Sequence, residues 1–597
     1  MKTIKLVILA SFAALFFSCD DFLDVRMEFN TTEEMFFGQG VNNFRALGMG
    51  SYSYLRGFND YGGGMLATAC DEADYAKPAN IQRFNTGAWG PFTNPNDVFG
   101  HYYAGIRHVN LFLEKSKGFE TKILMDTVTQ KPTWIKDCDD IYRLQAEARF
   151  LRAYYFMELI KRYGGLPIVT TVLTEDEAKN VTRSSFQECA QWVADECDAV
   201  YPELADTWLN YGIPTGQTRG RGEAPGITDV TRLGRIEKVA AKALKIRALL
   251  YAASPLHNES SDPVIWEKVA KAGNDFFTDA NCIWAKTLNT NYKALFDGSV
   301  ANNLTPRKGA NSGIIMTRYF SNTGSDWEKL NYPVGLINGG GGCTCPTQDL
   351  VDAFETKTQG LPINDPNAQY NPVLPYMNRD PRFDAMIAYN GSKMGKEITG
   401  VDHIIQAYET PSGAMGVDAI GSKYGATTTG YYLRKFSIDN YDLTKTNNKA
   451  KTWILMRYAE VLLNYAEAMN EIYGPDAKGT YTYTAREAVN LVRARAAMPA
   501  FPAGMTKEAF RTKYRNERRI ELAFEEQRFF DVRRWKIAEI TENKPIRGVK
   551  IMLDNNVPTY NYFDVETRVF NAPQMYLYPI PQAEVLKTPG LTQNTGW

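Results

Sequence analysis

The sequence predicts a mainly α protein, in which two blocks of packed helices form a scaffold and long loop-rich segments lie between them. Three observations support this prediction. Several segments repeat apolar residues every three to four positions, and alanines share the faces of the large apolar side chains. Stretches rich in Gly, Pro, Asn and Tyr, with little periodicity, separate the helical blocks. We therefore expect a helical scaffold that carries irregular surface segments.

The chain begins with a segment typical of a secretory signal. A cationic start precedes the uncharged apolar run Leu6–Phe17, and the small Ser18 follows it. This run is too short to cross a bilayer as a helix, which takes about 20 residues. We expect residues 1–18 to be removed and Cys19 to become the acylated N-terminus of a bacterial lipoprotein. The alternative is an ordinary secreted protein in which Cys19 has no special role.

The composition of the rest predicts a folded body with a large core. Residues 19–35 are expected to form a polar tether, and residues 36–597 a single body. The whole chain is 44% apolar and 23% charged. After removal of the signal, 65 basic residues remain against 68 acidic ones, so nothing points to nucleic acid as a partner. Cysteines are too sparse for a disulfide framework. The closely spaced Cys343 and Cys345 either form a strained disulfide or are neighbours by chance.

Helical periodicity is clearest in four segments, which form two pairs. The first pair covers residues 140–162 and 235–254, and Pro255 ends the second of these helices. The other pair covers 453–472 and 484–497. Further helices are expected at 100–116, 185–200, 263–279 and 506–540. Alanines at the contact positions let helices approach closely, as in tetratricopeptide-type helix pairs, so the scaffold is expected mainly in residues 100–280 and 452–540.

Residues 51–98 and 298–450 are expected to form the loop-rich ligand face. They contain turn-forming runs such as Asn94-Pro95-Asn96 and weak periodicity. Binding residues concentrate in irregular surface segments on rigid scaffolds. The helices are therefore expected to hold the shape, and the loops to bind.

None of the candidate catalytic or metal-binding motifs in the sequence is complete. Asp71-Glu72-Ala73-Asp74 spells a nucleotide-hydrolysis box, but no phosphate-binding loop accompanies it. No H-E-x-x-H zinc motif and no G-x-S-x-G elbow occur. We expect no cofactor and no metal. The paired carboxylates of a glycosidase stay open, since 68 acidic residues always offer pairs.

Residues 515–535 carry a dense run of alternating charge. Either the run is a surface that docks a partner, or it is a helix with ion pairs between neighbouring turns. The second interpretation predicts pairs such as Glu521 with Arg518 and Arg528 with Glu525.

Two tryptophans differ from the others. Trp192, Trp266, Trp453 and Trp535 fall on apolar helix faces and are expected in the core. Trp89 and Trp327 have turn-forming neighbours and are expected in loops. Large rings beside amides and acids suit a sugar, which packs its C–H face on an aromatic plane. The alternative is that each loop ring covers the local core.

In several stretches the sequence resembles the SusD/RagB family of surface lipoproteins of Bacteroidetes. These are the start Cys19-Asp20-Asp21-Phe22-Leu23-Asp24, the helix exit Arg162-Tyr163-Gly164-Gly165-Leu166-Pro167, the segment Pro346–Phe354, the runs Arg457–Leu463 and Glu517–Glu525, and the tail Tyr578-Pro579-Ile580-Pro581 with Leu591-Thr592-Gln593-Asn594. The resemblance covers nearly the whole chain.

The resemblance implies a right-handed superhelix of about four tetratricopeptide-type helix pairs with a loop-rich ligand-binding region. It also implies a non-catalytic protein, lipid-anchored at the outer membrane and facing the cell exterior. Such a protein captures oligo- or polysaccharide and acts as a lid over a SusC-like TonB-dependent transporter barrel. Carried onto this chain, the ligand contacts would be the aromatic residues Trp89, Trp327 and Tyr332 with the polar residues Asp71, Arg83 and Asn94.

Three other functions remain open from the sequence. A lid of the same fold would capture peptides rather than glycans. A glycosidase would release reducing ends, and an assembly protein would use its repeats to hold partners and bind no nutrient.

Overall fold

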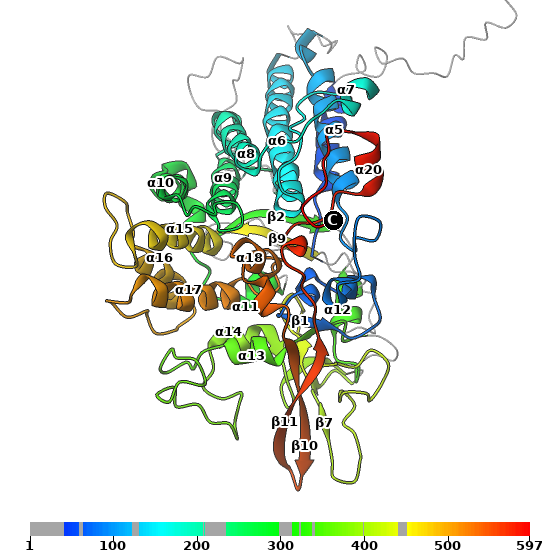
Figure 1. The fold of residues 1–597 in the computed structure, drawn as a ribbon, viewed down its shortest axis with the longest axis vertical. Helices are drawn as coiled ribbons and strands as arrows, with labels where there is room; N and C mark the ends of the chain where they lie inside the picture. Colours follow the sequence, from blue (N-terminus) through cyan, green and yellow to red (C-terminus); the bar gives the residue numbers. More distant parts are fainter. Residues whose placement is uncertain are drawn as a thin grey trace, which may run out of the picture.

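Two blocks of helices lie one above the other along the long axis of the molecule, above a third part made of loops and strands (Figure 1). We call this third part, residues 341–439 and 545–567, the loop-and-strand end. The computed structural model describes residues 41–58, 64–121, 131–206, 208, 234–297, 313–320, 324–336, 341–397, 399–439 and 451–597. The predicted signal, Cys19 and the predicted tether lie outside the described residues.

The first block contains the longest helices of the described chain. Its members are α3 (Val41–Gly50), α5 (Phe99–Lys115), α6 (Lys131–Tyr163), α8 (Phe186–Val200), α9 (Lys238–Ala253) and α10 (Pro263–Thr278). Successive helices pack on one another in the order α5, α6, α8, α9 and α10. The start of α8 is fixed by a capping box, in which Ser185 accepts the N–H of Glu188 and Glu188 accepts the N–H of Ser185.

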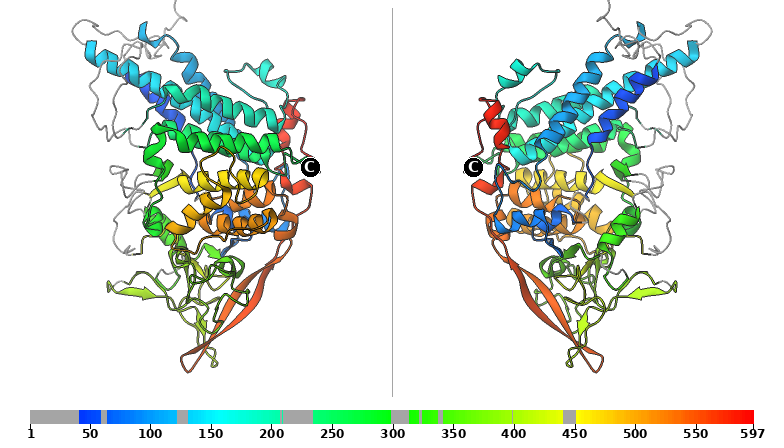
Figure 2. Two further views of the ribbon diagram at one scale, coloured as in Figure 1. Left: turned by 90° about the vertical axis from the view of Figure 1, so that its left-hand side faces the viewer. Right: turned by 90° about the vertical axis from the view of Figure 1, so that its right-hand side faces the viewer.

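The second block continues this order. It contains α15 (Tyr458–Tyr473), α16 (Ala485–Arg495), α17 (Lys507–Glu521) and α18 (Arg528–Arg534). α15 packs on α10 of the first block and on α16 and α17 of its own. A Cβ at Gly273 of α10 would lie only 2.7 Å from the ring of Tyr465, so this small residue permits the close approach of α10 to α15. Figure 2 shows the two blocks as stacked layers.

Short helices surround these blocks. They are α4 (Arg83–Thr86), α7 (Glu175–Lys179), α11 (Tyr292–Phe296), α12 (Gly324–Asn331), α13 (Gln348–Ala353), α14 (Pro381–Met386), α19 (Ala538–Thr541) and α20 (Gln582–Lys587). Among the described residues, no helix combines the length and the hydropathy that crossing a membrane would require.

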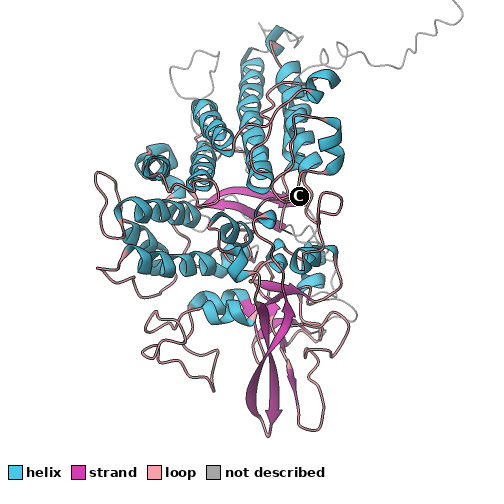
Figure 3. Ribbon diagram, in the orientation of Figure 1, coloured by secondary structure: helices cyan, strands magenta, loops and turns pink. Residues whose placement is uncertain are grey.

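The strands form small separate sheets, most of them at the loop-and-strand end (Figure 3). There β10 (Pro545–Asp554) and β11 (Val557–Thr567) form a long antiparallel hairpin, and β7 (Tyr408–Glu409) runs parallel to β10. The remaining antiparallel pairs are β1 (Ala73–Tyr75) with β3 (Thr344–Pro346), β4 (Ile387–Ala388) with β8 (Tyr432–Leu433), β5 (Lys393–Lys396) with β6 (Asp402–Ile404), and β2 (Ile314–Phe320) with β9 (Lys451–Arg457).

The predicted helix at 453–472 is wrong over its first five residues. Residues 451–457 form strand β9, and α15 begins only at Tyr458 after the extended Arg457. A short apolar run such as Trp453–Met456 fits a buried strand as well as a helix, and only the partner strand β2 decides between them.

The predicted helix at 506–540 is broken in the middle. α17 ends at Glu521, and α18 begins at Arg528. Between them Phe524 and Glu526 adopt positive φ angles of 64° and 58°, which a helix cannot contain. The other predicted helices agree with the structure to within a few residues, except that the one at 140–162 begins earlier, at Lys131. The predicted mainly α class with tetratricopeptide-type pairs is confirmed.

Candidate ligand-binding face

Exposed large apolar side chains gather at the loop-and-strand end. Such a gathering on a protein surface marks an interaction site more often than scattered single residues do. Those exposed in this part are Val373, Leu374, Met377, Val401, Ile404, Met415, Val417, Tyr424, Val557 and Tyr562. The same end holds a cluster of tyrosines.

We call this cluster the tyrosine face; its members are Tyr370, Tyr376, Tyr389, Tyr560 and Tyr562. The ring of Tyr376 lies at its centre, 4.2 Å from the ring of Tyr389 and 5.7 Å from that of Tyr560. Burial, followed by the neighbouring Tyr562, raises the pKa of Tyr370 above its ordinary value. Tyr562 is 48% exposed, and the rings of Tyr370, Tyr376, Tyr389 and Tyr560 are partly buried.

Local structure explains why these rings meet. Side chains two residues apart on a strand point to the same face, so β11 presents Tyr560 and Tyr562 together. The residues opposite them on β10, Ile551 and Val549, are both buried. Tyr389 follows β4 and stacks on the buried Phe383 of α14, with ring centres 5.3 Å apart and planes 20° apart.

Charged groups border the tyrosine face. Arg547 of β10 lies 2.7 Å from both Asp349 and Asp352 of α13, and each of the three side chains is partly exposed. Burial, followed by the charge of Asp352, raises the pKa of Tyr562 above its ordinary value. The Tyr389 hydroxyl donates to Asp384 Oδ1 at 3.0 Å. Aromatic planes thus lie beside carboxylates and a guanidinium, which can bind the C–H face and the hydroxyls of a sugar.

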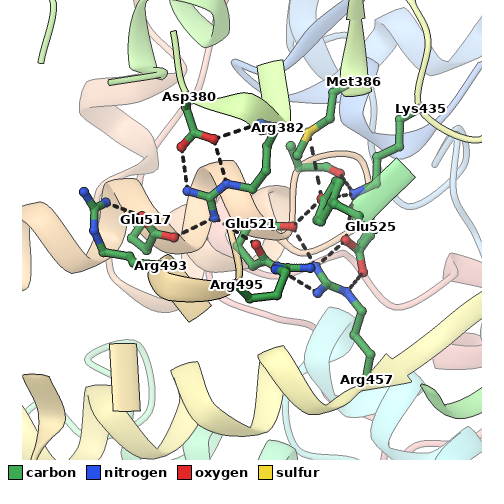
Figure 4. A network of polar contacts seen from close by, with 12 residues as sticks. Asp380, Arg382, Met386, Lys435, Arg457, Arg493, Arg495, Glu517, Glu521 and Glu525 are labelled. Atoms are coloured by element: carbon green, nitrogen blue, oxygen red, sulfur yellow. Dashed lines mark hydrogen bonds and ion pairs between the residues drawn. The ribbon is translucent and has the colours of Figure 1, made fainter. Parts of the chain in front are cut away.

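Arg382 of α14 connects this end to the second helix block (Figure 4). Its Nη1 donates to Glu517 Oε1 at 2.6 Å and to Glu521 Oε2 at 2.8 Å, both on α17. Its Nε and Nη2 donate to the two carboxylate oxygens of Asp380 at 3.0 and 2.6 Å. Breaking a buried pair by removing one partner costs about 3–5 kcal/mol, so this contact fixes α14 against α17.

The network continues to β9. Arg457 Nη1 donates to Glu521 Oε1 at 2.5 Å, and its Nε donates to Glu525 Oε2 at 2.6 Å. Arg495, the last residue of α16, also pairs with Glu521. Burial raises the pKa of Glu521, but the charges of Arg495, Arg457 and Arg382 outweigh it and hold this pKa well below its ordinary value. The carboxylate therefore stays ionised and joins three segments of the chain.

These contacts correct the prediction for the charged run. The predicted pairs of Glu521 with Arg518 and of Arg528 with Glu525 do not form. Arg518 instead pairs with Asp531 at 2.7 Å. One pair of the predicted i,i+3 kind, Asp531 with Arg534, does form. Glu517, Glu521 and Arg528 are instead buried and pair with other elements, because the turn after Glu521 points the charges away from a single helix.

Trp89 lies in the predicted loop, and its ring is buried, as the alternative interpretation of the loop rings predicted. The side chain is 6% exposed. Its ring lies 4.7 Å from Phe84, 5.5 Å from Tyr578 and 4.7 Å from the C-terminal Trp597. The ring covers the local core, and the exposed aromatic residue of this loop is Phe92, at 83%.

Trp327 packs on other rings than Trp89 does, and Tyr332 lies in a separate small cluster. Trp327 is in helix α12 rather than in a loop; it is 1% exposed, with its ring 5.1 Å from that of Trp453. Tyr332 is fully buried in a small cluster with Met394, and its hydroxyl donates to the Ile438 carbonyl. The structure thus places the predicted aromatic residues in separate parts of the core. Their assignment as ligand contacts stays a prediction.

The three predicted polar partners have different environments. Asp71 is buried and paired with Arg528 and Arg519, at 2.8 and 3.0 Å. Arg83 is exposed on α4, and Asn94 is half-buried, with its Oδ1 accepting the N–H of Asn96 at 3.0 Å. Only Arg83 and Asn94 are open to solvent. The seven cysteines in the described residues are free and buried, which excludes a disulfide between Cys343 and Cys345.

Sequence reasoning missed the tyrosine face. The alternation Tyr560-Asn561-Tyr562 in a segment of β-forming residues is a signal that a search for strands could have found. Tyr370, Tyr376 and Tyr389 carry no such signal, since only the fold brings them to the hairpin.

Comparisons with known proteins identify the family of this chain. The profile of the SusD family matches residues 285–597, more than half of the chain, and a second profile, described as starch-binding associating with outer membrane, matches residues 70–211. A curated relative, the SusD-like protein P2 of Formosa agariphila, is 32% identical over 143 residues, which are 24% of this chain. The match spans only 25% of that relative's own length.

Solved structures share the fold over nearly the whole chain. A SusD-like protein of Bacteroides fragilis has a TM-score of 0.72 and 25% identity, with 94% of this chain and 98% of that chain covered. A second Bacteroides fragilis protein, described as a SusD-like carbohydrate-binding protein, has a TM-score of 0.68 and 24% identity over 93% and 100%. A laminarin-binding SusD-like protein has a TM-score of 0.56 and 20% identity over 94% and 100%. The chain belongs to the SusD/RagB family, as its sequence motifs predicted.

Proposed function

We propose that this protein is a non-catalytic, cell-surface glycan-binding lipoprotein that captures oligo- or polysaccharide. It then acts as a lid that delivers the ligand to a TonB-dependent outer-membrane transporter. The observation that carries the proposal is the tyrosine face, in which partly exposed rings lie beside Asp352 and Arg547. Family membership and the carbohydrate-binding and laminarin-binding descriptions of two structural relatives support it.

The expected affinity is modest. If sugar faces stack as aromatic pairs do, each ring contributes about 0.5–1.5 kcal/mol beyond area burial. Two or three rings, less the cost of ordering the ligand, give dissociation constants roughly between millimolar and micromolar. Weak binding suits a protein that must release its ligand to a transporter.

Ligand contacts are proposed first at the tyrosine face. Arg83 and Asn94 remain proposed polar contacts. Trp89 and Trp327 are proposed contacts only if the residues that cover them move aside. The peptide-capturing lid and the assembly protein are the alternatives, because the same face of rings and charges accepts peptide side chains as well.

Calorimetric titration with a panel of neutral oligosaccharides and with mixed oligopeptides tests the proposal. We expect binding of at least one glycan, about two- to tenfold weaker binding by Tyr562→Ala, and no release of reducing ends. The exposed Phe92→Ala serves as a matched aromatic control outside the tyrosine face. Binding of peptides alone would assign the peptide-capturing lid, and unchanged glycan binding by Tyr562→Ala would remove this face as the site.

A further inference from the structure

A second candidate site lies between the helix blocks, away from the tyrosine face. A cavity of about 350 Å³ opens between α10, α15 and the first half of α17. This volume is at the lower end of the range of small-molecule sites, roughly 300–1,000 Å³. Its walls include Trp266 of α10, Glu467 and Glu471 of α15, and three cations of α17.

The three cations share one face of α17. Lys507, Arg511 and Arg515 are four residues apart in succession, so their side chains lie one above the other along the helix. All three line the cavity. A row of cations on one helix face offers an anion more than one partner.

The carboxylates of the cavity are already engaged. Glu471 is shared by Arg511, which donates to both its oxygens at 2.7 Å, and by Lys507 at 3.4 Å. Glu467 accepts from Arg534 through both oxygens at 2.7 Å and from the Trp535 indole N–H at 2.6 Å. Of the three α17 cations that line the cavity, Arg515 is the one that pairs with neither carboxylate.

Arg515 is the cation that lacks an anion. Within the part of the chain that the structure describes, its guanidinium makes no ion pair and no hydrogen bond. It lies over the ring of Trp535, 4.6 Å from the ring centre, which holds the guanidinium plane and leaves its N–H edge for other partners. Burial lowers the pKa of Arg515, and Glu467 offsets this only in part. An arriving carboxylate would therefore relieve a partly buried, unbalanced charge.

We propose that this cavity binds the carboxylate of a sugar-sized acidic ligand, a hexuronate, with Arg515 as its main partner. A guanidinium matches a carboxylate through two parallel N–H···O bonds, whereas a neutral sugar would leave the Arg515 guanidinium without a counter-ion. Arg511 and Lys507 line the same cavity, and the apolar wall of Trp266 suits the C–H face of a ring. The choice of a sugar as the carrier of the carboxylate rests on the proposed function; the anion preference does not.

Calorimetric titration of the full folded body with glucuronate, glucuronamide, glucose, acetate and sulfate tests the proposal. We expect glucuronate to bind, and the uncharged glucuronamide and glucose to bind at least about tenfold more weakly, because neither offers a charged partner to the guanidinium. Acetate and sulfate report whether the site takes any small anion. Equal binding of glucuronate, acetate and sulfate would overturn the assignment to an acidic sugar.

Variants locate the site. Arg515→Gln is expected to weaken glucuronate binding by about tenfold or more, whereas Lys271→Gln, which removes an exposed cation from α10, is expected to leave it unchanged. Unchanged binding by Arg515→Gln would overturn the proposal, and so would the absence of glucuronate binding to the unaltered protein. The glucuronamide comparison needs no variant, so it holds even if Arg515→Gln folds poorly. Binding of neutral glycans that depends on Tyr562 is measured separately, so either proposal can fail without the other.

Discussion

Arg528 of α18 holds Asp71 through both carboxylate oxygens, with Nε to Oδ1 at 2.8 Å and Nη2 to Oδ2 at 2.9 Å, although 457 residues separate them in the sequence. The contact joins the first loop-rich segment to the second helix block. Asp71 therefore anchors that segment. Its assignment as a ligand contact stays a prediction.

Asp71→Ala is expected to lower the free energy of unfolding by about 3–5 kcal/mol, because Arg528 and Arg519 would be left buried without their carboxylate. Urea unfolding followed by fluorescence measures the change. Arg83→Ala, at an exposed site on the neighbouring α4, is expected to change it by no more than about 0.5 kcal/mol. Equal effects of the two substitutions would contradict the anchoring role.

Trp327→Ala is expected to destabilise the protein by about 3–5 kcal/mol, because the ring is 1% exposed and packs on Trp453 and Phe436. Thermal unfolding measures this loss. Phe92→Ala removes an exposed ring and serves as the control, with little expected change. If Trp327→Ala kept its stability and lost glycan binding, the ring would be a ligand platform after all.

Glu72→Gln is expected to alter the dependence of stability on pH. Burial raises the pKa of Glu72 from its ordinary value of 4.5 to about 8, and Phe524 donates its N–H to Oε2 at 3.2 Å. A carboxyl with a raised pKa in the folded state contributes fully below pH 4.5, and its contribution is lost as the pH rises toward 8. Glutamine is neutral throughout, so the variant should lose less stability between pH 5 and 9.

Melting temperatures between pH 5 and 9 compare this variant with the unaltered protein. Glu539→Gln, at an exposed position of α19, is the matched control and should follow the unaltered protein. Parallel curves for all three proteins would show that Glu72 does not hold a proton in the folded state.

Tyr562→Phe is expected to retain most of the glycan affinity that Tyr562→Ala loses, because stacking needs the ring and not the hydroxyl. Affinity electrophoresis in gels that contain the bound polysaccharide compares the two variants. A loss of equal size in both would show instead that the hydroxyl carries the contact.

Cys19→Ala is expected to move the protein from the membrane fraction to the soluble one. A single acyl chain holds a protein only marginally at a membrane, and two or more hold it firmly. Immunoblots of fractionated cells of the native host measure the distribution. Continued membrane fractionation of the variant would show that another feature attaches the protein.

The sequence by itself determined the helical scaffold and the family. Periodicity predicted α5, α8, α9, α10 and α16 closely, because the apolar stripe of an amphipathic helix is a local property of the chain. It also located the long irregular segments, since Gly, Pro and Asn interrupt helices wherever they occur.

The tertiary structure alone decided which rings face solvent and which charges meet. Trp453 lies in a strand because β2 pairs with β9, and the rings of Trp89 and Trp327 are covered by aromatic residues from distant segments. The burial of a side chain and the partner of a charge depend on contacts across hundreds of residues. Local composition carries no record of them, so the tyrosine face and the unbalanced Arg515 emerge only from the folded chain.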